Sequence, residues 1–211
     1  MIKKFLNYIN DYEVITNLEE YIDRTYPGAE VVEIKSLELP EFVQSEFGDG
    51  KNNCTLASIL RVFMYHRDKF KILPESEESL YSTIKAAADT YFFNVFNGTL
   101  PMTISRIIKR SAEEYELDIK TKGHYNGNFY NPIKREIDHR RPLLMNIGFG
   151  KYKRHTVTIS GYISLKYRGM NIYILEVYDN WSRYKRFIDY SYLAHSIKSL
   201  NAYTFNTIEI K

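Results

Sequence analysis

The spacing of apolar residues changes along this sequence, from a helical period in the first two thirds to a strand period in the last third. After Cys54, apolar side chains recur every three or four residues, so this segment is the most apolar of the predicted helices. Beyond residue 142, most segments alternate polar and apolar side chains instead, as residues 156–165 do. A run of helices followed by a run of strands predicts an α+β fold, in which a helical N-terminal part packs on a C-terminal, mostly antiparallel sheet.

Helix caps and turn residues divide the chain into short elements. The predicted helices are the central one that begins at Cys54 and those at residues 3–10, 16–25, 75–93, 101–116 and 131–140. The predicted strands are residues 30–39, 142–147, 156–165, 171–178, 186–188 and 203–210. The chain of 211 residues contains no internal repeat or linker, and its length is typical of one domain.

The composition is that of a globular protein and argues against several functional classes. Hydrophobic residues make up 44% of the chain and charged residues 26%, which does not suit a disordered protein or a coiled coil. The net charge of +3 is too balanced to predict a nucleic-acid-binding surface. No segment approaches the roughly 20 apolar residues of a membrane span. The N-terminus begins with basic residues, but polar residues interrupt the apolar stretch that a signal peptide requires. We therefore expect a cytoplasmic protein, or an exported one whose signal peptide has been removed.

Cys54 is the only cysteine in the chain. A single cysteine excludes an internal disulfide and a zinc or redox site of the CxxC type. Cys54 follows a polar, glycine-rich loop and opens the central predicted helix, where the positive end of the helix dipole favours thiolate over thiol. A buried structural cysteine is the alternative, but such a residue is more common in the middle of a helix. The position therefore favours a nucleophile.

A nucleophilic thiol needs a base, and His155 is the histidine whose context suits that role. It immediately precedes the alternating strand 156–165, and the next strand ends at Asp179. Residues 166–169 between the two strands have the composition of a hairpin turn. The midpoint of positions 155 and 179 falls inside this turn, so the two side chains are expected to lie opposite each other. The Asp179 carboxylate would then accept the imidazole N–H and fix the tautomer of the ring.

These segments resemble papain-fold cysteine peptidases, particularly their bacterial C39-like branch. Residues 53–60 resemble the nucleophile helix of that family. Residues 141–162 resemble the segment in which Arg-Pro, an apolar strand and glycines lead to H-x-V-x-x-x-G-Y. Residues 178–181 resemble the end of the next strand, where the third catalytic residue lies. The resemblance covers about residues 32–190 and implies a papain-like fold of the α+β class.

The resemblance also implies a role for each matching residue. Cys54 would be the nucleophile, His155 its base and later the acid, and Asp179 the group that orients the imidazole. Asn180 is the alternative to Asp179, because the family uses either residue type. Trp181 resembles the aromatic residue that shields the contact between the histidine and its orienting group, although a half-buried interface tryptophan is an equal alternative.

The oxyanion donor departs from the family pattern. Papain-like enzymes carry a glutamine six residues before the cysteine, but Gly48 occupies that position here. We therefore expect the Gln44 side chain and the backbone N–H of Cys54 to hold the oxyanion, with Asn52 and Asn53 as alternatives to Gln44.

Three functions are compatible with this pattern. The first is a cysteine peptidase that hydrolyses peptide bonds through an acyl-enzyme. The others are a thiol-dependent acyltransferase on the same triad and a catalytically inactive papain-like binding module. Thr55 and Leu56, where many relatives carry Gly-Pro, keep both alternatives open. We expect residues 1–30 to form an N-terminal helical extension and residues 31–211 a single catalytic domain. The expected partner is a peptide or protein substrate, and neither a metal nor another cofactor is predicted.

Overall fold

The computed structural model describes residues 14–70, 73, 76–91, 93, 98–125, 127, 130–197 and 203–211. Its strands are β1 (Glu30–Ser36), β2 (Ile119–His124), β3 (Leu143–Ile147), β4 (His155–Tyr167), β5 (Met170–Tyr178), β6 (Arg186–Asp189) and β7 (Tyr203–Ile210). Its α-helices are α2 (Leu18–Thr25), α3 (Cys54–Phe70), α4 (Glu77–Thr90), α5 (Ile104–Glu113), α6 (Tyr130–Asp138) and α7 (Tyr190–Ile197). Short 3-10 helices are η1 (Gln44–Glu46), η2 (Pro101–Thr103) and η3 (Gly150–Tyr152). The helix predicted at residues 3–10 lies outside the described residues.

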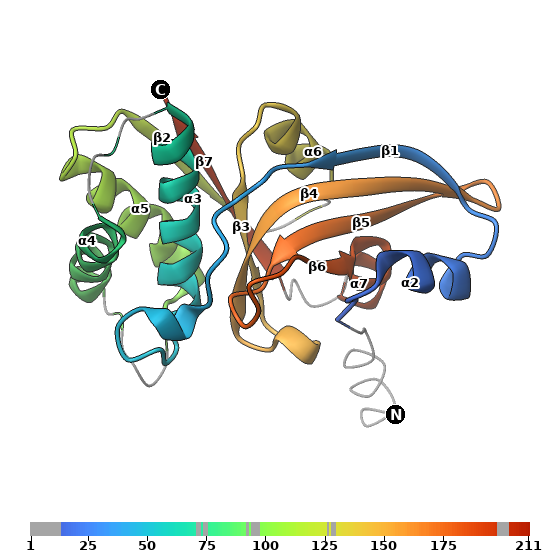
Figure 1. Ribbon diagram of the computed structural model, residues 1–211, viewed down its shortest axis with the longest axis horizontal. Helices are drawn as coiled ribbons and strands as arrows, with labels where there is room; N and C mark the ends of the chain where they lie inside the picture. The colour runs from blue at the N-terminus through green and yellow to red at the C-terminus, as the bar shows by residue number, and fades with distance from the viewer. Residues whose placement is uncertain are drawn as a thin grey trace.

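The strands in the described part of the chain form one antiparallel sheet in the order β2-β7-β3-β4-β5-β6, with β1 also paired to β4. The long strand β4 organises this sheet, because its first half pairs with β3 and its second half with β1, while β5 pairs along the other edge. Figure 1 shows α3, α4 and α5 on one side of the molecule, and the β4–β5 hairpin with α2, α6 and α7 on the other. The prediction of an α+β fold is confirmed.

The strand β4 passes very close to β1 at Gly161. A side-chain carbon at this position would lie 2.3 Å from the main-chain oxygen of Lys35, so glycine is required. The pairing of β4 with β5 shifts between Ile159 and Gly161, where β4 carries one extra residue. This β-bulge changes the alignment of the beginning of β4 with the end of β5.

Helix α3 occupies the centre of the helical side. Leu56, Ile59 and Leu60 have no exposed surface and belong to an apolar cluster with side chains of α4 and α5. Leu144 of β3 joins the same cluster. Each fully buried side chain of this kind contributes roughly 1.5–3 kcal/mol. The helix that begins at Cys54 is therefore held between two other helices and the sheet, as its apolar sequence predicts.

Arg61 of α3 is the largest side chain without exposed surface. Its guanidinium donates to the main-chain oxygens of Pro40 and Phe42, at 3.0 and 2.8 Å, and to the side chain of Asn180. Burial lowers the pKa of Arg61 to about 10, so the side chain stays positive at neutral pH. The planar fork of donors suits this task. Arg61 therefore ties the segment before η1 and the turn after β5 to the central helix.

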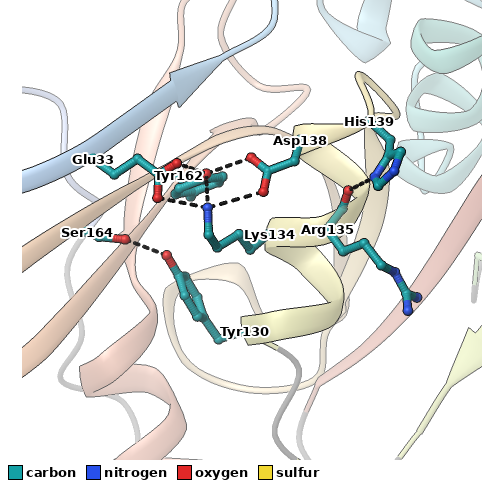
Figure 2. A network of polar contacts seen from close by, with 8 residues as sticks. All are labelled: Glu33, Tyr130, Lys134, Arg135, Asp138, His139, Tyr162 and Ser164. Carbon is teal, nitrogen blue, oxygen red and sulfur yellow. Dashed lines mark hydrogen bonds and ion pairs between the residues drawn. The ribbon is translucent and has the colours of Figure 1, made fainter.

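A second polar network fastens α6 to the sheet (Figure 2). Lys134 of α6 forms ion pairs with Glu33 of β1 at 2.8 Å and with Asp138 at 3.1 Å. The Tyr162 hydroxyl of β4 contacts the same two carboxylates and the Lys134 ammonium. Burial opposes the charge on Lys134, but hydrogen bonds to Glu33, Tyr162 and Asp138 outweigh it and raise the pKa of this lysine. The network therefore joins three elements of the β side of the molecule.

The sequence prediction missed β2 and α7. The strand β2 contains few apolar residues and pairs with β7 alone, so its alternation is weak. His124 ends this strand and pairs with Phe205. No helix among the described residues is long and apolar enough to cross a membrane.

Candidate functional site

Cys54 is the first residue of α3 and is largely buried. Asn53 caps the helix, because its main-chain oxygen accepts the N–H of Ala57 at 2.9 Å. The side-chain amide of Asn53 donates to the main-chain oxygens of Gln44 and Phe47, both at 3.0 Å, and so holds the preceding loop. N–H groups in the first turn of a helix have no partner within the helix. Cys54 is thus fixed at the positive end of α3.

His155 is the first residue of β4, and its ring lies against the Cys54 thiol. Burial raises the pKa of this thiol, but a hydrogen bond to His155 and the electrostatic interaction with this residue lower it. Hydrogen bonds from the N–H and the hydroxyl of Thr156 lower it further. The result is a pKa below the ordinary value of a cysteine. The structure therefore brings the predicted nucleophile and the predicted base together.

The orienting contact to His155 comes from the main chain of Asp179. Nε2 of the ring hydrogen-bonds to the Asp179 carbonyl oxygen. A carbonyl only accepts, so Nε2 carries the proton and Nδ1 is left for the thiol. We expected the carboxylate to make this contact, but it points elsewhere: it accepts the N–H groups of Trp181 and Ser182, both at 3.0 Å, and the Tyr152 hydroxyl at 3.3 Å. The carboxylate is used to close the turn after β5.

The hairpin between β4 and β5 does not have the register expected from its midpoint. Thr158 pairs with Tyr178, so three residues further along each strand His155 would face Trp181 rather than Asp179. The cause of the difference is a two-residue turn with positive φ angles at positions 168 and 169, which is centred later in the chain than predicted. The β-bulge in β4 reduces this difference by one residue, because without it His155 would face residue 182.

Trp181 covers the His155 ring, in agreement with the new register. The two rings are stacked, with centroids 4.0 Å apart and planes 29° apart. Tyr152 lies against the same pair, with its ring centroid 5.2 Å from that of Trp181 and 5.8 Å from that of His155. The buried Tyr152 also hydrogen-bonds to Asp179. The imidazole and its partner are thereby shielded from water on this side, although Trp181 itself is half exposed.

Asn180 has no exposed surface and joins the segments that carry the site. Its backbone is left-handed, with φ of 64°, a conformation that asparagine tolerates better than most residues. Its amide nitrogen donates to the main-chain oxygens of Cys54 and Thr156, at 3.1 and 2.9 Å, and to the Ser58 hydroxyl at 2.8 Å. Its side-chain oxygen accepts from Arg61. These bonds place the Asn180 side chain between α3 and β4, and the orienting contact belongs to Asp179.

A cavity of about 530 Å³ opens beside Cys54 and His155. One part of its lining is a chain of hydrogen-bonded polar side chains. The Thr55 and Thr156 hydroxyls are 2.7 Å apart, Thr156 donates to Asn146 at 2.9 Å, and Asn146 donates to Thr204 at 2.9 Å. The apolar part of the lining consists of Leu100, Pro101, Ile147, Phe149 and Tyr203. Cys54 and His155 therefore face a space large enough for several side chains.

Gln44 is close to the site through its main chain. Its main-chain N–H donates to the main-chain oxygen of Asn180 at 2.9 Å, and its main-chain oxygen accepts from the side-chain amide of Asn53 at 3.0 Å. Its side-chain amide donates to the Gly50 oxygen at 3.3 Å, and Gln44 does not line the cavity, whereas Asn52 does. The Asn53 amide is occupied by the loop that it holds. A role for Gln44 at the oxyanion therefore requires its amide to leave Gly50.

Sequence reasoning missed Thr156 and Tyr152. The hydroxyl of Thr156 contacts the thiol, and its place directly after His155 is a signal that the sequence contains. Tyr152 has no comparable signal, because its contact depends on how η3 folds beneath Trp181. No group of three or more His, Cys, Asp or Glu side chains in the described part of the chain is arranged to hold a metal ion.

Comparisons with known proteins agree with this arrangement. A family model described as the Peptidase_C39 like family matches residues 36–204, which is most of the chain. The matched segment includes Cys54, His155 and Asp179. A search of curated proteins found no match. N-terminal helices packed on a mostly antiparallel sheet are consistent with the papain-like fold of C39 peptidases. The chain therefore belongs to the Peptidase_C39-like family of cysteine peptidases.

Proposed function

We propose that this protein hydrolyses peptide bonds, with Cys54 as the nucleophile, His155 as the acid and base, and Asp179 as the residue that orients the imidazole. The observation that carries the proposal is the position of the His155 ring. It lies between the Cys54 thiol and the Asp179 carbonyl, beside a cavity that both Cys54 and His155 line. A structural cysteine would need neither the imidazole nor the cavity.

The reaction follows from the positions of the two nitrogens. His155 Nδ1 takes the thiol proton, and the Cys54 sulfur attacks the carbonyl carbon of the scissile bond. Nδ1 then returns the proton to the amine as the carbon–nitrogen bond breaks, which leaves a thioester on Cys54. Water that gives its proton to the same nitrogen attacks the thioester and releases the acid. Throughout, Nε2 keeps its hydrogen bond to Asp179.

The oxyanion forms next to the start of α3. The backbone N–H of Cys54 supplies one donor, since the first turn of the helix leaves it without a helical partner. We assign the second donor to the Gln44 amide, because hydrogen bonds fix the Gln44 main chain to the residues that directly adjoin Cys54 and Asp179. The carbonyl of a bound substrate would replace Gly50 as the partner of this amide.

The first prediction concerns the nucleophile and the base. Cys54→Ala and His155→Ala should each lower the rate of peptide cleavage by at least about 10³-fold, because either change removes the attacking thiolate. Cleavage of a proteome-derived peptide library, followed by mass spectrometry, measures the loss. Ser82→Ala on the exposed face of α4 is the control and should retain the wild-type rate. Full activity in Cys54→Ala would exclude the proposed mechanism.

The second prediction concerns the pH dependence of the thiol. Because the pKa of Cys54 lies below the ordinary cysteine value, its thiolate should persist to lower pH than that of a free thiol, whose pKa is about 8.5. The rate of alkylation by iodoacetamide should therefore rise to its plateau with a midpoint below that of N-acetylcysteine treated in parallel. His155→Ala should move the midpoint upward, since burial then dominates. A wild-type midpoint at or above that of the free thiol would contradict the assignment.

The third prediction separates the two oxygen-bearing groups of Asp179. Asp179→Asn keeps the main-chain carbonyl and an oxygen for the N–H groups of Trp181 and Ser182, so kcat should fall by less than about 10-fold. A triad that depended on the carboxylate would lose about 10⁴-fold. Asp179→Ala removes the oxygens that close the turn and should cost more than Asp179→Asn. Steady-state kinetics on one cleaved peptide measures both, and a loss near 10⁴-fold in Asp179→Asn would return the role to the carboxylate.

The fourth prediction tests the second oxyanion donor. Gln44→Ala should lower kcat by about 10²- to 10³-fold with a smaller change in KM, as loss of a donor that acts in the transition state does. Asn52→Ala is the matched comparison, because Asn52 lines the cavity. If Asn52→Ala shows the larger fall in kcat and Gln44→Ala is nearly wild type, the donor is Asn52.

A further inference from the structure

The charged side chain at the cavity beside Cys54 is positive. Among the described residues that line it, Arg154 is the one permanently charged side chain, and neither aspartate nor glutamate is present. The segment that leads into β4 adds Lys151 and Lys153, which are exposed and lie on either side of Tyr152. The remaining lining residues are Cys54, His155, glycines, and uncharged polar or apolar side chains. A group with negative charge is therefore the complement of this cavity.

Arg154 is available to bind such a group. Its side chain is exposed, and no ion pair joins it to a carboxylate in the part of the chain that the structure describes. Other arginines do form ion pairs: Arg141 pairs with Glu136 at 2.7 Å, and Arg183 pairs with Glu46 at 2.7 Å. A guanidinium binds a carboxylate through two parallel hydrogen bonds, so its geometry suits this partner.

The position of Arg154 also indicates which side of the scissile bond of a peptide substrate it would contact. Its backbone is left-handed, with φ of 55°, and it directly precedes His155. In the proposed reaction His155 gives its proton to the leaving amine, so the leaving half of the peptide lies on the histidine side of the cavity. Arg154 lies on that same side.

We propose that Arg154 binds a carboxylate on the leaving half of the substrate, within one or two residues of the scissile bond. Phe149 and Leu100, which line the cavity and remain 42% and 57% exposed, provide apolar surface for the neighbouring side chains of the peptide. The carboxylate has two possible sources, an acidic side chain or a free C-terminus. The inference rests on the proposed peptidase activity and names the substrate class of that site.

Matched peptides test this selectivity. A peptide that the wild-type protein cleaves in a proteome-derived library is synthesised with Glu or Gln directly after the scissile bond and an amidated C-terminus. A third version has Gln at that position and is shortened so that a free C-terminal carboxylate lies in the same place. Wild-type kcat/KM should be about 10- to 100-fold higher for one or both carboxylate peptides than for the amidated Gln peptide. The version that gains identifies the source of the carboxylate, and the advantage should shrink with added salt.

Two variants connect the preference with Arg154. Arg154→Gln should bring the ratio of the carboxylate to the uncharged peptide close to one, and Arg154→Glu should invert it. Lys153→Gln removes a neighbouring positive charge that does not line the cavity, and it should keep the wild-type ratio. Equal cleavage of all three peptides by the wild type, or an unchanged ratio in Arg154→Gln, would overturn the inference while leaving the peptidase activity in place. Cleavage of no library peptide at all would instead overturn the proposed function, and the inference with it.

Discussion

The side chain of Asn180 is the contact on which the site depends. Four hydrogen bonds join it to Cys54, Ser58, Thr156 and Arg61, so one buried amide links the start of α3, the start of β4 and the turn after β5. These segments carry the proposed nucleophile, the proposed base and the carbonyl that contacts the imidazole. Amide groups buried in this way are costly to leave unpaired, and catalysis is sensitive to displacements of about 1 Å. The geometry of the site therefore depends on a residue to which the proposed mechanism assigns no chemical step.

Opposing effects on the thiol explain why this arrangement suits a nucleophile. Burial of Cys54 alone would favour the neutral thiol, which is unreactive. The His155 ring and the donors of Thr156 outweigh burial, and Trp181 with Tyr152 excludes water from the far side of the imidazole. The cavity, which Cys54 lines, gives access to the sulfur. The arrangement thus combines a low thiol pKa with access that the lining of the cavity controls.

Sequence reasoning placed Cys54 and His155 together, as the structure does, but it did not place their contacts. The spacing of apolar residues was enough to predict that Cys54 begins a helix and that His155 lies at the start of a strand. The register of the hairpin could not be predicted in this way, because the turn is centred later than its composition indicated and the β-bulge near Gly161, where β1 approaches closely, then moves the pairing back by one residue. For the same reason the carbonyl of Asp179 rather than its carboxylate meets the ring. The side chain of Asn180, the alternative to Asp179, bonds to α3 and β4, and the hydrogen bond to the His155 ring comes from Asp179.

The central claim is that Cys54 forms an acyl-enzyme that water then hydrolyses. The most direct measurement is mass spectrometry of the intact protein after rapid mixing with an activated ester of a cleavable peptide and quenching in acid. The account predicts a single acyl group on Cys54 that appears before the product and decays with release of the free acid. An acyl group that leaves only when an amine acceptor is added would show a transferase. Cleavage of the ester without any adduct on Cys54 would contradict the account altogether.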